Sequence, residues 1–100
     1  MKRRFAGELI LVIYDITDDG LRLRVASFLK SKGLVRVQKS AFLGRASAAR
    51  KTEIEAGLRR LLKGAENVNV QIYPIPPSSF HRRVVIGTGF EEEESGVLVF

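Results

Sequence analysis

The sequence predicts an α+β fold in which two amphipathic helices cover one face of an antiparallel sheet. Strand-like and helix-like segments follow in the order strand, helix, extended segment, helix, strand, strand, and each helical segment carries one apolar stripe. The chain has 100 residues and no visible repeat, which is the size of one domain. We therefore expect a single ferredoxin-like sandwich (βαββαβ) over residues 1–100, with its core in residues 8–87 and an extra C-terminal strand.

The first strand is predicted at Glu8–Tyr14, because the run ELILVIY is apolar without alternation, as in a strand covered on both edges or both faces. Asp18 follows as the N-cap of a helix that Gly33 is expected to end. The apolar stripe of this helix consists of Leu21, Val25, Phe28 and Leu29.

The second half of the fold begins with an extended segment, residues 34–44, which we expect to bend or form a tight hairpin near Lys39-Ser40. Ser47 is expected to cap a second helix, which Gly64 ends. Gly57 weakens that helix by about 1 kcal/mol relative to alanine without preventing it. Its buried stripe consists of Ile54, Leu58, Leu61 and Leu62.

Two further strands are predicted at residues 67–75 and 82–87, joined by the proline-rich connection PIPPSSFH. The chain ends on the apolar run GVLVF, residues 96–100. A free apolar strand promotes aggregation unless it is paired, so we expect it to join its own sheet or that of a neighbouring subunit, and we favour the exchanged form in a homodimer. A disordered tail is the alternative.

The charge distribution indicates a basic surface. The net charge is +6, and between Arg22 and Arg60 eleven lysines and arginines stand against two acids, while four acids gather at Glu91–Glu94. Such a surface attracts nucleic acid by neutralising phosphates and releasing counterions. The alternative is that these charges only keep a small domain in solution.

Composition also limits where the protein works. The absence of cysteine excludes disulfides and thiolate metal sites and fits a reducing cytoplasm. The N-terminus superficially resembles a signal peptide, but its apolar run is only about seven residues and leads into Asp15 instead of a small-residue cleavage site. No run approaches the ~20 apolar residues of a membrane span. We expect a cytoplasmic protein without a membrane partner.

Common catalytic sets are missing from the sequence. His81 is the only histidine, which we expect at the surface or a strand edge, and the glycine pair Gly87 and Gly89 lacks the lysine of a phosphate-binding loop. The remaining candidates are carboxylates, which bind hard cations. Asp18 and Asp19 have alternative roles at a helix N-terminus.

Asp15 has no such structural role. It ends a strand of six apolar residues, where a carboxylate loses hydration unless something compensates it. A partner arginine and a bound metal would both do so, and the residues leave the choice open.

Five motifs occur in a specific order: YDITDD, LRLRVASFLKSKGL, VRVQKSAFLG, VQIYPI and RRVVIG. Together they closely resemble a CRISPR-associated family, the smaller of the two near-universal spacer-acquisition proteins, known as CRISPR-associated endoribonucleases. The resemblance extends from about Leu9 to Phe100, and its strength lies in the combination, since each motif alone is weak. Two departures, Gly20 and Leu43-Gly44, replace residues that are commonly polar or acidic.

The resemblance implies a ferredoxin-like fold and a homodimer whose sheets meet face to face, with the C-terminal strand commonly paired with the partner. It implies that Asp15, preceded by Tyr14, binds Mg²⁺ together with its symmetry mate. The other matching motif positions are Arg22, Arg24, Arg36, Ser40 and Phe42. The implied reaction is metal-dependent endonucleolytic cleavage of RNA or DNA, in which arginines stabilise phosphate charge and Phe42 stacks on a base if it is exposed. As a strand residue, Phe42 is instead expected in the core, and this alternative is favoured.

Two other functions remain open. The first is a non-catalytic dimeric scaffold that holds double-stranded DNA and positions the CRISPR integrase. Basic residues of the middle segment would then bind phosphates, or else lie on solvated helix faces: Arg45, Arg50, Lys51, Arg59 and Arg60. The second is a ferredoxin-like RNA-binding module outside CRISPR defence, which would be monomeric and independent of magnesium.

Overall fold

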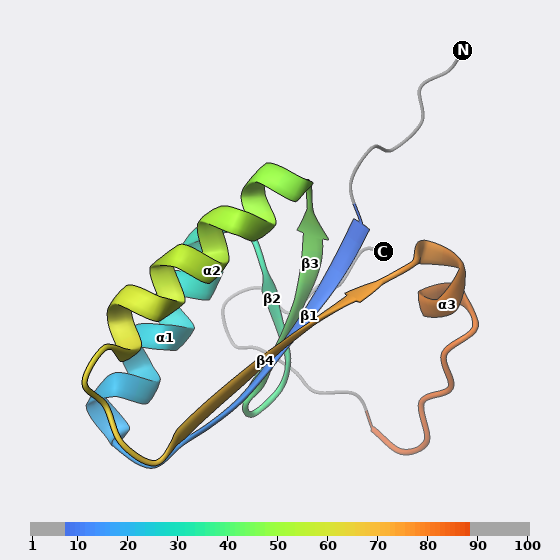
Figure 1. Cartoon of the computed structure of the whole chain (residues 1–100). Coiled ribbons are helices and arrows are strands. Elements are labelled where there is room, and N and C mark those ends of the chain that lie inside the picture. The colour runs from blue at the N-terminus through green and yellow to red at the C-terminus, as the bar shows by residue number, and fades with distance from the viewer. Residues whose placement is uncertain (1–7, 89–100) are drawn as a thin grey trace.

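A computed structural model of the chain describes residues 8–88, in which two long helices lie on one face of a four-stranded antiparallel sheet (Figure 1). The sheet order is β2-β3-β1-β4. The elements along the chain are β1 (Glu8–Ile16), α1 (Asp19–Ser31), β2 (Val35–Gln38), β3 (Ala41–Ala46), α2 (Ala48–Leu62), β4 (Val68–Ile75) and α3 (Pro77–His81). This order confirms the predicted ferredoxin-like βαββαβ core.

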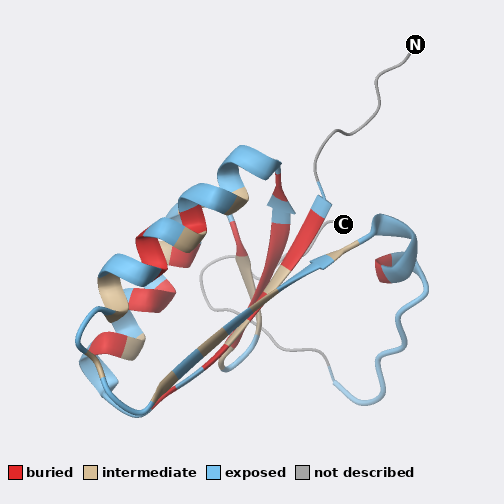
Figure 2. Ribbon diagram, in the orientation of Figure 1, coloured by how far each residue is buried: buried red, intermediate tan, exposed pale blue. Residues whose placement is uncertain are grey.

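The central strand is β1, which pairs with β3 on one edge and β4 on the other. Its alternating side chains divide the sheet into a helix-covered face and an open face. On the helix-covered face lie Ile10, Val12, Tyr14 and Ile16, all buried. Figure 2 shows buried residues, in red, both in the sheet and in the two long helices. On the open face lie Leu9, Leu11, Ile13 and Asp15, of which only Leu9 is buried. The run ELILVIY is apolar without alternation because β1 is the central strand, paired on both edges, and because its open face is also largely apolar.

Both predicted helix caps are confirmed. The Asp18 carboxylate accepts a hydrogen bond from the Leu21 amide at 2.7 Å, and the Ser47 hydroxyl accepts one from the Arg50 amide at 3.1 Å. Each bond satisfies one amide that the first helical turn leaves without a partner. The helices end before Gly33 and Gly64, as predicted, and both glycines have a positive φ.

Gly57 has a role that the sequence did not indicate. It is buried where α2 meets α1, and a Cβ placed on it would lie 2.1 Å from Cζ of Phe28. Only a residue without a side chain therefore allows the two helices to approach this closely.

The predicted hairpin is confirmed, since β2 and β3 pair across a turn at Lys39-Ser40. A register shift between Arg36 and Gln38 distorts β2. In β3, Phe42 is the largest of the fully buried side chains in the described chain.

The predicted strand at residues 82–87 is wrong for the described chain. These residues contain no strand, and Val84 and Ile86 are 80% and 93% exposed. Their β-branched pattern favours a strand, but a strand forms only where a neighbour accepts its backbone hydrogen bonds. No strand within residues 8–88 pairs with them.

The proline-rich connection also differs from the expected irregular link, because α3 forms inside it. Pro77 suits the first helical turn, where its missing N–H costs nothing. Phe80 from this helix is buried against Leu9 and Leu43, so α3 covers part of the open face. The predicted strand at 96–100 and the acids Glu91–Glu94 lie outside the described residues. Within residues 8–88, no helix is long and apolar enough to cross a membrane.

Candidate metal and nucleic-acid site

Asp15 lies near the end of β1 on the open face, directly opposite Asn69 of β4. The expectation that it is a desolvated acid at the end of a buried strand is wrong, because its side chain is exposed. The helices cover only every second residue of the apolar run, and Asp15 belongs to the residues between them, which lie on the open face. Among the described residues it has no ion pair.

A single exposed carboxylate is a partial metal site. Residues 8–88 contain no group of three or more histidines or acids that could hold a metal ion. Mg²⁺ accepts one or two carboxylates and retains several waters, so the carboxylate oxygens of Asp15 are chemically suitable ligands. The donor set fits Mg²⁺ if a second copy of the chain contributes its own Asp15.

Tyr14 and Phe42 lie on the opposite face of the sheet from Asp15. Both rings are buried, and they stack with their centroids 6.3 Å apart. The prediction that Phe42 stacks on a base required an exposed ring, so the structure contradicts it. Both residues belong to the core beneath the helices.

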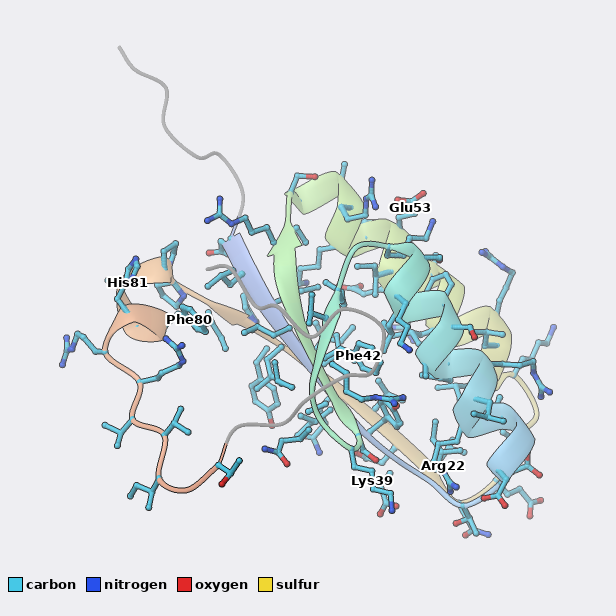
Figure 3. All side chains as sticks on the ribbon, turned by 180° about the vertical axis from the view of Figure 1, so that it is seen from behind. Arg22, Lys39, Phe42, Glu53, Phe80 and His81 are labelled. Carbon is cyan, nitrogen blue, oxygen red and sulfur yellow. The ribbon has the colours of Figure 1, made fainter. Side chains whose placement is uncertain are left out.

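The three predicted arginines have different surroundings within one chain. Arg22 donates a hydrogen bond to the Ile16 carbonyl at 3.1 Å and pairs with Asp19 at 2.5 Å, so it braces the connection that follows Asp15 (Figure 3). Arg24 is exposed and makes no hydrogen bond or ion pair within residues 8–88. Arg36 is half-buried, with its guanidinium 5.1 Å from the centre of the Phe42 ring. Of the three, only Arg24 is exposed.

Two of the predicted phosphate-binding residues are held by acids or by the backbone. Arg50 donates to the Lys32 carbonyl at 3.2 Å and pairs with Glu53 at 3.3 Å. Lys51 pairs with Glu55 at 2.7 Å, and its hydrogen bond and charge lower the pKa of that carboxyl below its ordinary value of 4.5.

The other three are exposed in different places. Arg45 lies on the open face of β3, opposite Leu9, whereas Arg59 and Arg60 lie in the last turn of α2. The structure therefore spreads the five residues over a helix and a strand and does not gather them at Asp15.

Three polar residues on the open face were not among the candidate site residues predicted from the sequence: Asn69, Gln71 and Tyr73. They are exposed and joined by hydrogen bonds along β4. The alternation of NVNVQIY contains the signal, because it places these three residues on one face of a strand and the valines and isoleucine on the other.

These features define a class: a small basic protein of ferredoxin-like fold with a solvent-accessible acid at the end of its first strand. The model of the family "CRISPR associated protein Cas2" matches residues 8–83. The chain belongs to this family, which confirms the resemblance seen in the sequence.

Similar proteins carry related names. The "CRISPR-associated endoribonuclease Cas2" of Korarchaeum cryptofilum (strain OPF8) is 42% identical over 80 residues, covering 80% of this chain and 85% of that protein. A "CRISPR-associated endonuclease Cas1/endonuclease Cas2 fusion" of Thermoproteus tenax is 38% identical over 66 residues, covering 66% of this chain and 25% of the fusion. A "crystal structure of cas2" is 31% identical with a TM-score of 0.70, covering 94% of this chain and 98% of that one.

Proposed function

We propose that this chain is a magnesium-dependent endonuclease of CRISPR adaptation, which cleaves phosphodiesters of RNA or DNA as a homodimer. The observation that carries the proposal is the exposed carboxylate of Asp15, which ends β1 on the open face without an ion pair in the described chain. The names of its relatives as endoribonucleases agree with this activity.

The open face supports the pairing of two copies. Leu11, Val37 and Ile75 are partly exposed there, around a small buried cluster that includes Phe80. Docking a second open face would remove this apolar surface from water. A two-fold axis close to Asp15 would also bring this residue next to its symmetry mate, where the two carboxylates repel unless a cation lies between them.

In this site the chain supplies ligands and positioning. Asp15 from each subunit would hold Mg²⁺, which acidifies a bound water and neutralises phosphate charge. Arg22 fixes the backbone that follows Asp15 through its bond to the Ile16 carbonyl. Arg24 is exposed and would place positive charge against the scissile phosphate.

The test is cleavage of single-stranded RNA, double-stranded RNA and double-stranded DNA, with Mg²⁺ and with EDTA. Asp15→Ala should reduce Mg²⁺-dependent cleavage at least about a hundredfold, while duplex binding is retained. Glu8→Ala, at the opposite end of the same strand, is the matched control and should cleave like the parent. An Asp15→Ala protein that cleaves as fast as the parent contradicts the proposal.

A non-catalytic scaffold for the Cas1 integrase is the second candidate. Its support is the pair of exposed arginines in the last turn of α2, Arg59 and Arg60, and the natural Cas1/Cas2 fusion in Thermoproteus tenax. It predicts a parent that cleaves nothing at any pH or metal tested. It also predicts duplex binding that weakens steeply with salt. The slope of the logarithm of the binding constant against the logarithm of the salt concentration should fall in magnitude by about 1 for each phosphate-binding arginine replaced by glutamine.

A further inference from the structure

A row of polar side chains leads along β4 towards Asp15. Asn69, Gln71 and Tyr73 alternate with apolar residues and are exposed on the open face, with Tyr73 46% exposed. Successive residues on one face of a strand are about 6.6 Å apart, which long polar side chains can span. Asparagine is disfavoured in strands, so its position within β4 requires an explanation beyond strand propensity.

The hydrogen bonds of the row have one direction. The Tyr73 hydroxyl donates to Oε1 of Gln71, and Nε2 of Gln71 donates to Oδ1 of Asn69 at 2.9 Å. The oxygen of each amide is therefore used on the side facing Tyr73. The Nδ2 donors of Asn69 are left at the other end of the row, and no hydrogen bond within residues 8–88 uses them.

Asp15 lies at that end. It is paired with Asn69 across the β1–β4 ladder, where directly opposite Cβ atoms are about 4.5–5.5 Å apart. No hydrogen bond joins the two side chains in this structure, and at this separation a rotation of the exposed Asp15 side chain would bring a carboxylate oxygen within reach of Nδ2. The neighbouring open-face position on β1 is Ile13, which offers no polar group.

We propose that Asn69 is a positioning residue for Asp15. Its Nδ2 donates a hydrogen bond to one carboxylate oxygen and leaves the other oxygen to bind a divalent cation, while Gln71 and Tyr73 hold the amide in this orientation. Outer hydrogen bonds of this kind orient metal ligands, and their loss commonly weakens metal affinity 10- to 100-fold. The inference rests on the proposed metal site at Asp15.

The test uses two replacements of the same shape. Asn69→Val removes the donor, and Asn69→Thr retains a hydroxyl donor on an equally β-branched side chain. Mn²⁺ affinity, measured by electron paramagnetic resonance on the full chain, should weaken at least about tenfold in Asn69→Val. Asn69→Thr should bind at least about fivefold more tightly than Asn69→Val. Both variants should unfold at nearly the same temperature, which separates positioning from a loss of stability.

Each outcome decides the proposal. Mn²⁺ binding that is lost in Asp15→Ala but weakened less than tenfold in Asn69→Val overturns the role of Asn69 and leaves the metal site intact. Equal weakening in the Val and Thr variants also overturns it. If Asn69→Val fails to fold, Gln71→Val removes the brace instead, and an unchanged affinity there overturns the proposal. A parent that binds Mn²⁺ no better than Asp15→Ala overturns the metal site and the inference together.

Discussion

Replacing Gly57 by alanine should destabilise this protein, although helix propensity alone predicts the opposite. In an ordinary helix interior, the change from glycine to alanine stabilises by about 1 kcal/mol. Here the new Cβ would lie 2.1, 2.6 and 3.0 Å from three atoms of the Phe28 ring. Carbon atoms in contact need about 3.5 Å, so the ring must move by on the order of 1.4 Å.

The magnitude follows from these two opposing effects. Forcing an extra methyl group into a packed contact costs about 1–3 kcal/mol, and the middle of that range exceeds the gain in propensity by about 1 kcal/mol. For a chain of 100 residues this lowers the unfolding midpoint by about 4–8 °C. Movement of the ring also disturbs the Lys32 ammonium, which lies 5.6 Å from the ring centre.

Thermal unfolding followed by circular dichroism at a fixed protein concentration measures the effect. Ala56→Gly, at the exposed neighbouring position of α2, is the matched control and should lose about 1 kcal/mol from propensity alone. Phe28→Leu removes the crowded ring, so Gly57→Ala should become neutral or stabilising in that background. A Gly57→Ala protein that unfolds at or above the parent's temperature refutes the close-packing argument.

Two further predictions follow from the buried ring of Phe42 and from the Lys51–Glu55 pair. Because the ring of Phe42 is fully buried, Phe42→Ala should lower the free energy of unfolding by about 3–5 kcal/mol. Phe42→Leu should retain nucleic-acid affinity in a filter-binding assay, since a buried ring does not contact nucleic acid. Lost affinity in a well-folded Phe42→Leu protein would contradict the core position of this residue. Lys51→Met should return the pKa of Glu55 towards 4.5 in an NMR titration, since the hydrogen bond and charge of Lys51 hold it lower. Because a lowered carboxyl pKa stabilises the folded state above pH 4.5, the stability difference from the parent should shrink as the pH falls through the lowered folded-state pKa. A difference that is the same at all pH values argues against this linkage.

Much of the fold could be predicted because its signals are local. Asp18 and Ser47 cap their helices through residues three positions away, and Gly33 and Gly64 follow the helix ends through their own backbone conformation. The prediction of a strand at residues 82–87 was wrong because it depended on a contact that is not local. The β-branched residues of this segment fit a strand, but pairing depends on a distant partner that no local pattern specifies.

The candidate site was only partly predictable. The position of Asp15 at a strand end follows from the apolar run and the resemblance to the family. The exposure of Asp15 does not follow from the sequence, because a run that is apolar on both faces does not indicate which face the helices cover. The motif match made Phe42 a candidate for contacts with nucleic acid, whereas its place in a strand favoured the core, where the ring lies.

The sequence by itself determined the order of the elements, the helix ends and the family, since these depend on residues close together in the chain or on motifs in a fixed order. Only the tertiary structure decided which face of the sheet each side chain occupies and which distant residues meet. Gly57 meets Phe28 and Asp15 faces Asn69 because packed helices and paired strands join positions 29 and 54 residues apart. Such contacts arise from burial of apolar surface and from ladder register, which are properties of the whole chain.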